Sequence, residues 1–451
     1  MGGPILQGIA RAGGCVFGRI ASASEHVGSV KYWLVKPASI LACSAAFVAG
    51  VTAAASCSGP SRTTASATNA ALSCFGDRFS ERVKGGLAGY ADVVDIPGIS
   101  VGIVAADSLV YATSHGYADR STQTPAASDT PYNIASLTKV FTATLALMFA
   151  DEGALNLDAP VSRYLPDSVR VPTDSAGHAI TARHLLSHTS GLPKNPPNRR
   201  NLKVTGPLDP EVWDAYNIPD LYHGLAVTKI DGEVGTQHRY SNYGYALLGH
   251  VLERIASRPY EALLRERILD PLGMTDTSIT LGQEQQKRLA AFYWSEDVKR
   301  AEQRVHAKFG DVAGFIGVTS TVTDLARFVS AHLGTSRSPR NPVTRKVADA
   351  MAQPQFSLLV DALGRDDVGL GWFRMEFVDE TPHKVVLFHT GSVDGHTSGL
   401  YLLPRKGIGV IVLQNLGGVD GDRGIEQFGT WLLRLAAQEL STCTEPPRRT
   451  H

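Results

Sequence analysis

Hydrophobic residues form strand-like runs at the two ends of the chain and helix-like patterns between them. Near the start, the apolar runs 99–105 and 109–114 are separated by Ala106-Asp107-Ser108, a pattern that predicts two strands joined as a hairpin. Apolar runs at 385–388, 399–403 and 408–413 predict further strands near the end of the chain.

Helices are expected on both sides of these strands and throughout the middle of the chain. The spacing of Leu145, Met148 and Phe149, with Gly153 as the stop, predicts a helix over 137–152. Similar reasoning predicts a first helix over 77–90, a Pro- and Asn-rich loop over 193–209, and helices over 242–257, 260–268, 323–333 and 422–440. The economical arrangement is an α/β plus all-α fold, in which one antiparallel sheet is built from both chain ends, is flanked by helices and carries an inserted helical lobe.

The first part of the chain reads as a targeting segment. Residues 37–61 carry no charge, Lys31 and Lys36 precede an apolar run at 40–55, and small residues end it, which together indicate a secretory signal. The run is short for a membrane span. Cys57 resembles a bacterial lipoprotein attachment cysteine, although Ala54 stands where that motif usually has leucine. An uncleaved hydrophobic anchor, an ordinary signal peptide and an organellar transit peptide remain alternatives.

These patterns divide the chain into four parts: a leader over 1–57, a tether over 58–73, a main folded domain over 74–443 and a flexible tail over 444–451. Export to the cell membrane or the bacterial envelope is expected, with contact to the membrane through the lipid or the hydrophobic anchor. Lys+Arg and Asp+Glu number 43 each, without a basic block, which argues against a nucleic-acid partner.

Five cysteines fit an oxidising compartment. Cys15, Cys43 and Cys57 belong to the leader or its end, which leaves Cys74 and Cys443 near opposite ends of the remaining chain. A disulfide between these two forms if the terminal helices meet on the sheet. The alternative is two unrelated thiols.

Ser136-Leu137-Thr138-Lys139 is a candidate nucleophile and base. The pair lies at the start of a predicted helix, so Ser136 and Lys139 share one face, one turn apart. A lysine in a poorly hydrated cleft at the positive end of a helix has its ammonium form disfavoured and can act as a base. Taken alone, a helix-capping serine and a solvated lysine explain the motif equally simply.

Tyr240-Ser241-Asn242 is the second candidate, on a loop that enters a predicted helix. A cation beside Tyr240 would favour its phenolate, which could accept the serine proton and return it to a leaving group. The amide of Asn242 could bind a substrate carbonyl and also contact Lys139. A turn with an asparagine helix cap is the alternative.

His389-Thr390-Gly391-Ser392 is the third candidate, directly after the expected strand 385–388. Gly391 would let a substrate approach an exposed strand edge, where backbone N–H groups can pair with it. The N–H groups of Ser136 and Ser392 could form an oxyanion hole, and His389 would face the cleft as a polar or cationic contact. A strand-end turn with a surface histidine is the alternative.

Together the three motifs occur in the order used by penicillin-recognising serine enzymes. The chain resembles the class C β-lactamase and D,D-carboxypeptidase family through residues 131–139 (PYNIASLTK), 184–192 (HLLSHTSGL), 271–274 (PLGM), 369–372 (GLGW) and 389–391 (HTG). The resemblance spans roughly residues 77–440. It implies a β-lactamase/transpeptidase-like fold, Ser136 as nucleophile, Lys139 and Tyr240 as the proton-handling pair, and Asn242 with 389–392 as the substrate-binding residues.

The resemblance implies no metal or cofactor. His184 and His188 are four residues apart, but no glutamate follows His184 as the metalloprotease pattern requires. His389 stands where class C β-lactamases carry lysine, which weakens the case for a dedicated β-lactamase. The leading expectation is therefore a D,D-carboxypeptidase or a D-amino-acid peptidase. An esterase, a β-lactamase, and a penicillin-binding protein without turnover are the alternatives, with a small peptide, ester or β-lactam as ligand.

Overall fold

The computed structural model describes residues 74–105, 107–198, 216–293, 301–302, 310–336, 338–361, 364–377, 384–393, 395–417 and 424–444. The predicted leader with Cys57, the tether, the end of the tail and residues 199–209 of the predicted loop lie outside these ranges. None of the helices in the described ranges combines the length and the hydropathy that crossing a membrane requires.

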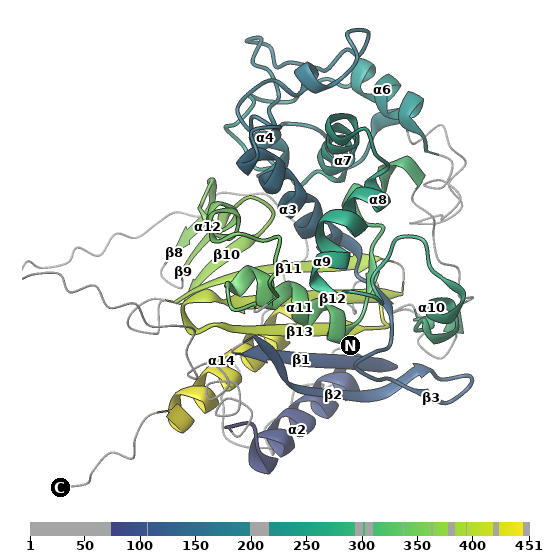
Figure 1. Ribbon diagram of the computed structural model, residues 1–451, viewed down its shortest axis with the longest axis vertical. Coiled ribbons are helices and arrows are strands. Elements are labelled where there is room, and N and C mark those ends of the chain that lie inside the picture. The colour runs from purple at the N-terminus through teal and green to yellow at the C-terminus, as the bar shows by residue number, and fades with distance from the viewer. Residues whose placement is uncertain are drawn as a thin grey trace, which may run out of the picture. The chain divides into compact units, whose positions relative to one another are not determined.

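A nine-stranded antiparallel sheet joins the two ends of the chain, as predicted (Figure 1). Its order is β3-β2-β1-β13-β12-β11-β10-β9-β8, so that β1 near the start pairs with β13 near the end, with Ile103 opposite Val410. Both strands are buried along their whole length, which explains their continuous apolar runs. The strands are β1 (Gly98–Ala105), β2 (Ser108–Asp119), β3 (Thr124–Pro125), β8 (Phe356–Asp361), β9 (Gly364–Val368), β10 (Phe373–Phe377), β11 (Lys384–Val393), β12 (His396–Leu403) and β13 (Ile408–Gln414).

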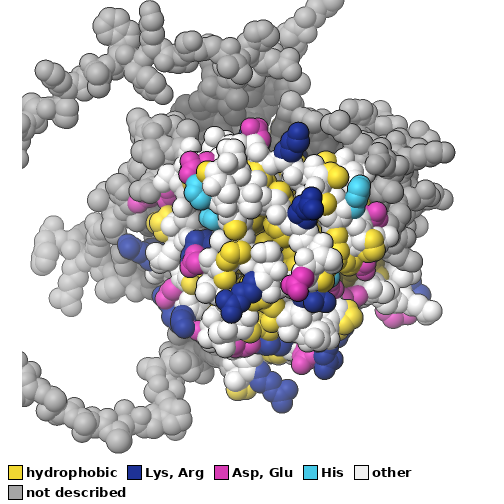
Figure 2. All heavy atoms as spheres, turned by 90° about the horizontal axis from the view of Figure 1, so that it is seen from above, with side chains coloured by type: hydrophobic (Ala, Val, Ile, Leu, Met, Phe, Trp, Pro, Cys, Tyr) yellow, Lys and Arg dark blue, Asp and Glu magenta, His cyan; other side chains and the backbone are white. Residues whose placement is uncertain are grey.

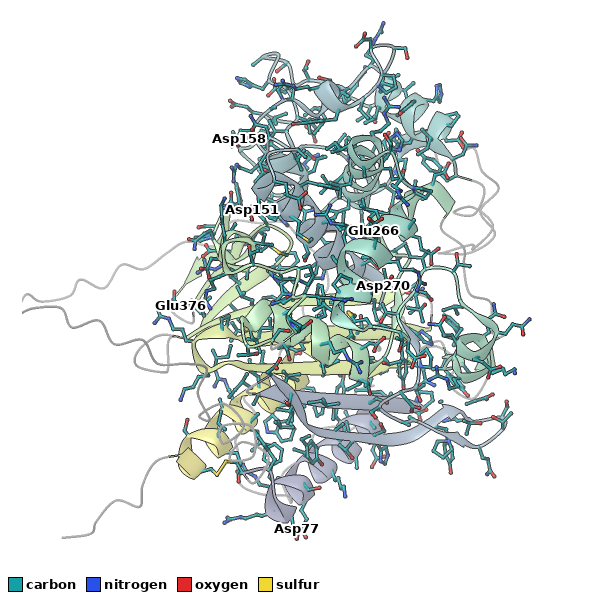
Figure 3. The ribbon with its side chains drawn as sticks, in the orientation of Figure 1. Asp77, Asp151, Asp158, Glu266, Asp270 and Glu376 are labelled. Atoms are coloured by element: carbon teal, nitrogen blue, oxygen red, sulfur yellow. A yellow bond between two sulfur atoms is a disulfide. The ribbon has the colours of Figure 1, made fainter. Side chains whose placement is uncertain are left out.

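The terminal helices α2 (Asp77–Val94) and α14 (Ile425–Thr444) pack on one face of this sheet. Apolar residues at helical spacing, Phe79, Val83 and Leu87 among them, form the buried stripe of α2. Figure 3 labels Asp77, which begins this helix. The sulfur atoms of Cys74 and Cys443 are bonded at 2.08 Å, so the segment that precedes α2 is joined covalently to α14.

On the other face, α11 (Val322–Leu333) packs against β1, β2, β12 and β13, and helices such as α4 (Ala182–Leu186), α6 (Ile218–Val227) and α7 (Asn242–Ala256) lie further from the sheet (Figure 1). In α3 (Thr138–Asp151) every residue from Thr138 to Phe149 is buried, so this helix lies inside the core instead of presenting one polar face. Asp151, at its end, pairs with Lys346 of α12 at 2.5 Å. The other helices are α8 (Tyr260–Leu264), α9 (Asp270–Leu272), α10 (Gln283–Arg288) and α12 (Arg345–Ala352).

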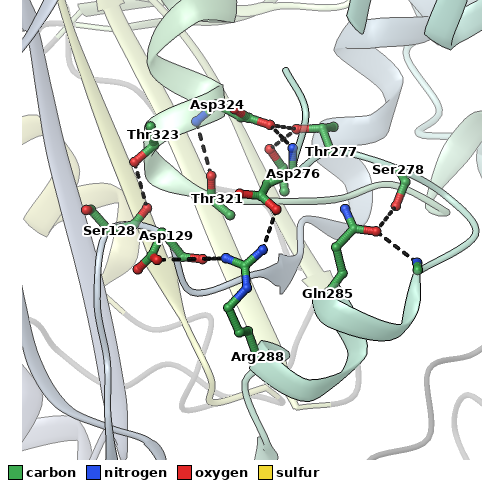
Figure 4. Close-up of polar contacts among 12 residues, drawn as sticks. Ser128, Asp129, Asp276, Thr277, Ser278, Gln285, Arg288, Thr321, Thr323 and Asp324 are labelled. Atoms are coloured by element: carbon green, nitrogen blue, oxygen red, sulfur yellow. Dashed lines mark hydrogen bonds and ion pairs between the residues drawn. The ribbon is translucent and has the colours of Figure 1, made fainter. Parts of the chain in front are cut away.

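A polar network fastens the segment after α9 to the start of α11 (Figure 4). The buried carboxylate of Asp324 accepts hydrogen bonds from the Asp276 N–H at 2.7 Å and the Thr277 hydroxyl at 2.9 Å. Arg288 of α10 in turn binds the carboxylate of Asp276. Because the strand β7 (Thr319–Ser320) directly precedes α11, this network also holds β7 in place, and β7 pairs with β4 (Tyr132–Asn133) just before Ser136.

Two of the predicted helices contain turns of another helical type. The predicted helix 260–268 changes at Leu264 into a π-turn, η5 (Arg265–Leu269). The predicted helix 137–152 begins one residue later, because Leu137, together with Ser136, belongs to a 3-10 turn, η2 (Ala135–Leu137). The remaining short elements are η3 (Val161–Tyr164), η6 (Gly310–Phe315), η7 (Pro404–Lys406) and a pair of strands, β5 (Phe292–Tyr293) and β6 (Ala301–Glu302).

Candidate active site

Ser136 sits on a tight turn between a short strand and a buried helix. The preceding residue, Ala135, has φ +49°, a left-handed conformation that a non-glycine residue adopts only when its surroundings enforce it. The N–H of Ala135 donates to Oδ1 of Asn133 at 2.8 Å, which stabilises the turn. The backbone thus turns sharply at the candidate nucleophile, whose side chain stays partly exposed.

Lys139 lies in the first turn of α3 with its ammonium nitrogen directed at Ser136. Nζ of Lys139 is 2.9 Å from Oγ of Ser136 and donates to the carbonyl oxygen of Phe315 at 2.9 Å. The side chain is fully buried. Burial lowers the pKa of Lys139 well below its usual range, and the positive charge of Lys194 lowers it further. A neutral amine has a lone pair that can accept the hydroxyl proton of Ser136.

Tyr240 completes a cluster of hydroxyl, amine and phenol. Its side chain shares a hydrogen bond with Ser136, and its ring centroid lies 5.0 Å from Nζ of Lys139. Burial raises the pKa of Tyr240 far above its usual value, and the hydrogen bond with Ser136 offsets only part of that rise. The expectation of a phenolate favoured by a neighbouring cation is therefore wrong, because desolvation disfavours both charges. The favoured pair is a neutral amine beside a protonated phenol.

His188 packs against the ring of Tyr240 and binds the backbone next to it. Its ring lies 4.3 Å from the ring of Tyr240, and its Nδ1 accepts a hydrogen bond from the Ser241 N–H at 3.1 Å. Ser241, and not Asn242, caps α7, since its hydroxyl accepts from the Gly244 N–H at 2.9 Å. Thr181 is the N-cap of α4, and His184 completes its capping box by accepting a hydrogen bond from the Thr181 N–H, so both histidines of the spaced pair have structural partners. Across the described residues, no three metal-ligating side chains cluster.

Asn242 lies at the first position of α7, where it contacts the start of the predicted Pro- and Asn-rich loop 193–209. Its Nδ2 donates to Oδ1 of Asn195 at 3.1 Å, and its backbone N–H donates to the carbonyl of Lys194 at 2.9 Å. Asn242 and Asn195 are both partly exposed and Lys194 is exposed. Two side-chain amides therefore lie next to each other close to Tyr240, with a lysine adjoining them.

The end of β11 forms the opposite side of the site. Pairing of β10 with β11 ends at Phe388, so residues 389–393 extend past β10. An added Cβ on Gly391 would meet the carbonyl oxygen of Ile134 at 2.4 Å and the nitrogen of Ser136 at 2.8 Å, so only glycine fits where β11 passes the turn. Thr390 and Ser392 are partly exposed on this edge.

His389 is buried, and its Nδ1 donates to the carbonyl oxygen of Thr390 at 2.6 Å. Burial is the main cause that lowers the pKa of His389 to about 3; the charged form of Lys139 acts in the same direction, and the hydrogen bond to Thr390 opposes both. The ring is therefore neutral at physiological pH, and its Nε2 can accept a hydrogen bond. Of the two roles expected for His389, the structure favours a polar contact over a cationic one.

The chain has an antiparallel sheet with helices on both faces. Further helices surround a serine and a buried lysine. This arrangement is that of the β-lactamase/transpeptidase class of folds. The chain belongs to the β-lactamase family, since the family model described as Beta-lactamase matches residues 87–429. The predicted family and fold class are thus confirmed.

Individual relatives agree with this assignment. The chain is 30% identical over 289 residues to the D-alanyl-D-alanine-carboxypeptidase/endopeptidase AmpH of Escherichia coli, covering 63% of this chain and 71% of that protein. It is 27% identical over 342 residues to Protein flp of Staphylococcus aureus, covering 75% of this chain and 63% of that protein. A β-lactamase/D-alanine carboxypeptidase from Yersinia pestis has a similar structure, with a TM-score of 0.64 and 26% identity over 80% of this chain and 99% of that one.

The face of the molecule that lies at the top of Figure 1 carries charges of both signs. Figure 2 shows Lys and Arg side chains interspersed with Asp and Glu among hydrophobic and uncharged groups on this face. On the side chains that the figure colours by type, the charges do not gather into a patch of one sign. Mixed charge of this kind does not create a field that steers polyanions.

Proposed function

We propose that this chain is an exported serine hydrolase that acts through an acyl-enzyme on Ser136, with the activity of a D,D-carboxypeptidase or D-amino-acid peptidase. The observation that carries the proposal is the 2.9 Å contact between Oγ of Ser136 and Nζ of Lys139, an amine whose pKa burial depresses. A neutral amine at this distance can remove the serine proton without first losing one of its own.

In the proposed acylation, Oγ of Ser136 attacks the substrate carbonyl carbon while its proton passes to Nζ of Lys139. The carbonyl oxygen becomes an oxyanion, which the N–H groups of Ser136 and Ser392 would bind. As the C–N bond breaks, the phenol of Tyr240 donates its proton to the leaving amine and takes one back from the ammonium of Lys139. Attack by water on the acyl-enzyme, with the same two groups moving its proton, releases the acid and restores Ser136.

Asn242, Asn195 and the edge of β11 would bind the substrate. An extended peptide could pair with the backbone of 390–392, as an added strand does at an open sheet edge. Support for a peptide substrate comes from the relatives described as D-alanine carboxypeptidases, one of them 30% identical. The neutral His389 gives a substrate carboxylate no permanent cation at that position, and this favours an esterase as the second candidate.

Export is supported by the bond between Cys74 and Cys443, since disulfides persist in oxidising compartments. Lipid attachment at Cys57 remains part of this proposal. Mass spectrometry of the protein recovered from membranes tests it: a diacylglycerol mass on the peptide that begins at Cys57 is expected. An unmodified peptide that continues through this cysteine would contradict lipidation.

The substrate class is tested by comparing a D-alanyl-D-alanine peptide, a p-nitrophenyl ester and nitrocefin, each with wild type and Ser136→Ala. The proposal predicts turnover of the peptide that Ser136→Ala abolishes. Turnover of the ester alone would identify an esterase, and turnover of nitrocefin a β-lactamase. Covalent labelling by penicillin without turnover of any substrate would indicate a binding protein instead.

A further inference from the structure

The short strand β4, just before Ser136, has hydrogen-bond partners on both edges. On one edge the partner is the backbone of another strand, and on the other edge the partners are side chains. On one edge, β4 pairs with β7, Asn133 lies opposite Thr319, and the N–H of Ile134 donates to the carbonyl of Val318 at 2.9 Å. On the other edge, side chains of β12 take the place of a neighbouring backbone. That second edge contains the residues that fix the turn at Ala135.

Two side chains of β12, two residues apart and therefore on the same face of the sheet, bind this edge. Nδ1 of His396 accepts a hydrogen bond from the Asn133 N–H at 2.9 Å. The hydroxyl of Ser398 donates to the carbonyl of Ile134 at 2.8 Å. One acceptor and one donor thus replace the backbone groups of a third strand.

His396 is held so that only one form of its ring fits. It is fully buried, its Nε2 lies 3.2 Å from the carbonyl oxygen of Ala290, and its ring stacks on Phe292 at 4.1 Å with an interplanar angle of 12°. An N–H faces Nδ1 and a carbonyl faces Nε2, so the ring is neutral with its hydrogen on Nε2. In this tautomer the ring connects the Asn133 backbone to the segment at Ala290.

From His396 the contacts lead to the nucleophile in two steps. The ring holds the backbone of Asn133, and Oδ1 of Asn133 holds the N–H of Ala135, the residue with φ +49°. Ser136 follows immediately. We propose that His396 is a positioning residue that sets the place of the Ser136 hydroxyl and N–H through Asn133, an inference that rests on the proposed role of Ser136 as the nucleophile.

Three substitutions separate this role from simple packing. His396→Asn places an amide oxygen near the position of Nδ1 and keeps an acceptor for the Asn133 N–H. His396→Gln places an amide nitrogen near the position of Nε2 and keeps only the bond to Ala290. His396→Phe keeps a ring to stack on Phe292 and loses both bonds.

The inference predicts that phosphonylation of Ser136 by a fluorophosphonate, in which Oγ displaces fluoride from phosphorus, falls about 10²-fold in His396→Phe and His396→Gln, since a misplacement of about 1 Å can cost that much. His396→Asn should keep most of the rate. In His396→Phe and His396→Gln, the decrease should appear in the first-order rate constant of labelling and not in the reagent concentration that gives half saturation. Thr397→Val is the matched control: its buried hydroxyl donates to the carbonyl of Leu416 at 2.7 Å, so this variant should lose stability and keep its rate. Equal rates in the Asn, Gln and Phe variants would overturn the inference.

A second measurement does not depend on catalysis. Hydrogen exchange followed by mass spectrometry should show that the peptide over 132–137 is protected in wild type and His396→Asn and exchanges faster in His396→Phe. Unchanged protection in His396→Phe would refute the positioning role even with an active enzyme. If wild type is protected but is not labelled at Ser136, the proposed function fails while the structural part of the inference stands.

Discussion

Replacing Lys139 by methionine tests the proposed base most sharply, because methionine nearly preserves the length of the buried chain and removes the amine. Nζ is fully enclosed and has contacts of 2.9 Å to both Ser136 and the Phe315 carbonyl. General-base catalysis contributes about 10²- to 10⁴-fold, so kcat/KM and the rate of labelling should fall by that factor. Loss of the hydrogen bond from Nζ to the Phe315 carbonyl should lower the free energy of unfolding by about 1 kcal/mol.

The assay is the second-order rate of fluorophosphonate labelling across pH, beside thermal unfolding of each variant. Wild-type activity should be lost as pH falls through the depressed pKa of Lys139, because the amine must be neutral to accept a proton. Lys194→Met is the matched control. Removing the charge of Lys194 raises the pKa of Lys139. The fall of the labelling rate on the acid side should therefore move to higher pH, while the maximal rate stays the same. A folded Lys139→Met variant that reacts within about threefold of wild type would refute the role of the lysine as a base.

Four further outcomes follow from the same geometry. Tyr240→Phe keeps the ring beside His188 and removes the phenol, so turnover should fall about 10²-fold or more with unfolding unchanged; near-normal turnover would exclude a proton transfer through Tyr240. Because the pKa of His389 is about 3, kcat/KM should not change near neutral pH through titration of this group. A change of kcat/KM with pH in that range that disappears in His389→Gln would contradict a neutral ring. Gly391→Ala should stop labelling, because its Cβ would lie 2.8 Å from the Ser136 nitrogen; normal labelling would show that β11 need not pass so close. Replacing Cys74 and Cys443 by serine should lower the free energy of unfolding in denaturant by about 2–5 kcal/mol, and an unchanged midpoint would contradict the bond.

The elements that the sequence patterns predicted are those with strong local signals. Continuous apolar runs marked β1 and β13, and a helical stripe marked α2, so one sheet from both chain ends could be inferred before any coordinates. The strands β8, β9 and β10 were missed. In β9 and β10, charged residues such as Asp366, Asp367 and Arg374 interrupt the apolar pattern. Asp367 and Arg374 pair across the strands at 2.7 Å, so the charges that obscured the strands stabilise their pairing.

For the site, helical spacing was sufficient to predict that Ser136 and Lys139 meet. The Phe315 carbonyl could not be predicted, since a backbone acceptor has no side-chain signature and lies far along the chain. The ionisation of Tyr240 was inferred wrongly, because a sequence shows which charges are available but not how deeply they are buried. Asn195 follows the recognised segment 184–192 by three residues, and only this short distance could have indicated that Asn195 lies at the site.

Peptide mass mapping after trapping with a β-lactam identifies the residue that forms the acyl-enzyme. The protein is incubated with benzylpenicillin, quenched in acid and digested, and the site of the added mass is read from fragment ions. The structure predicts one penicilloyl group on Ser136, in the peptide that also contains Lys139, and none in the Ser136→Ala variant. An adduct on another residue of the folded wild-type protein, or equal labelling of Ser136→Ala, would contradict the assignment of the nucleophile.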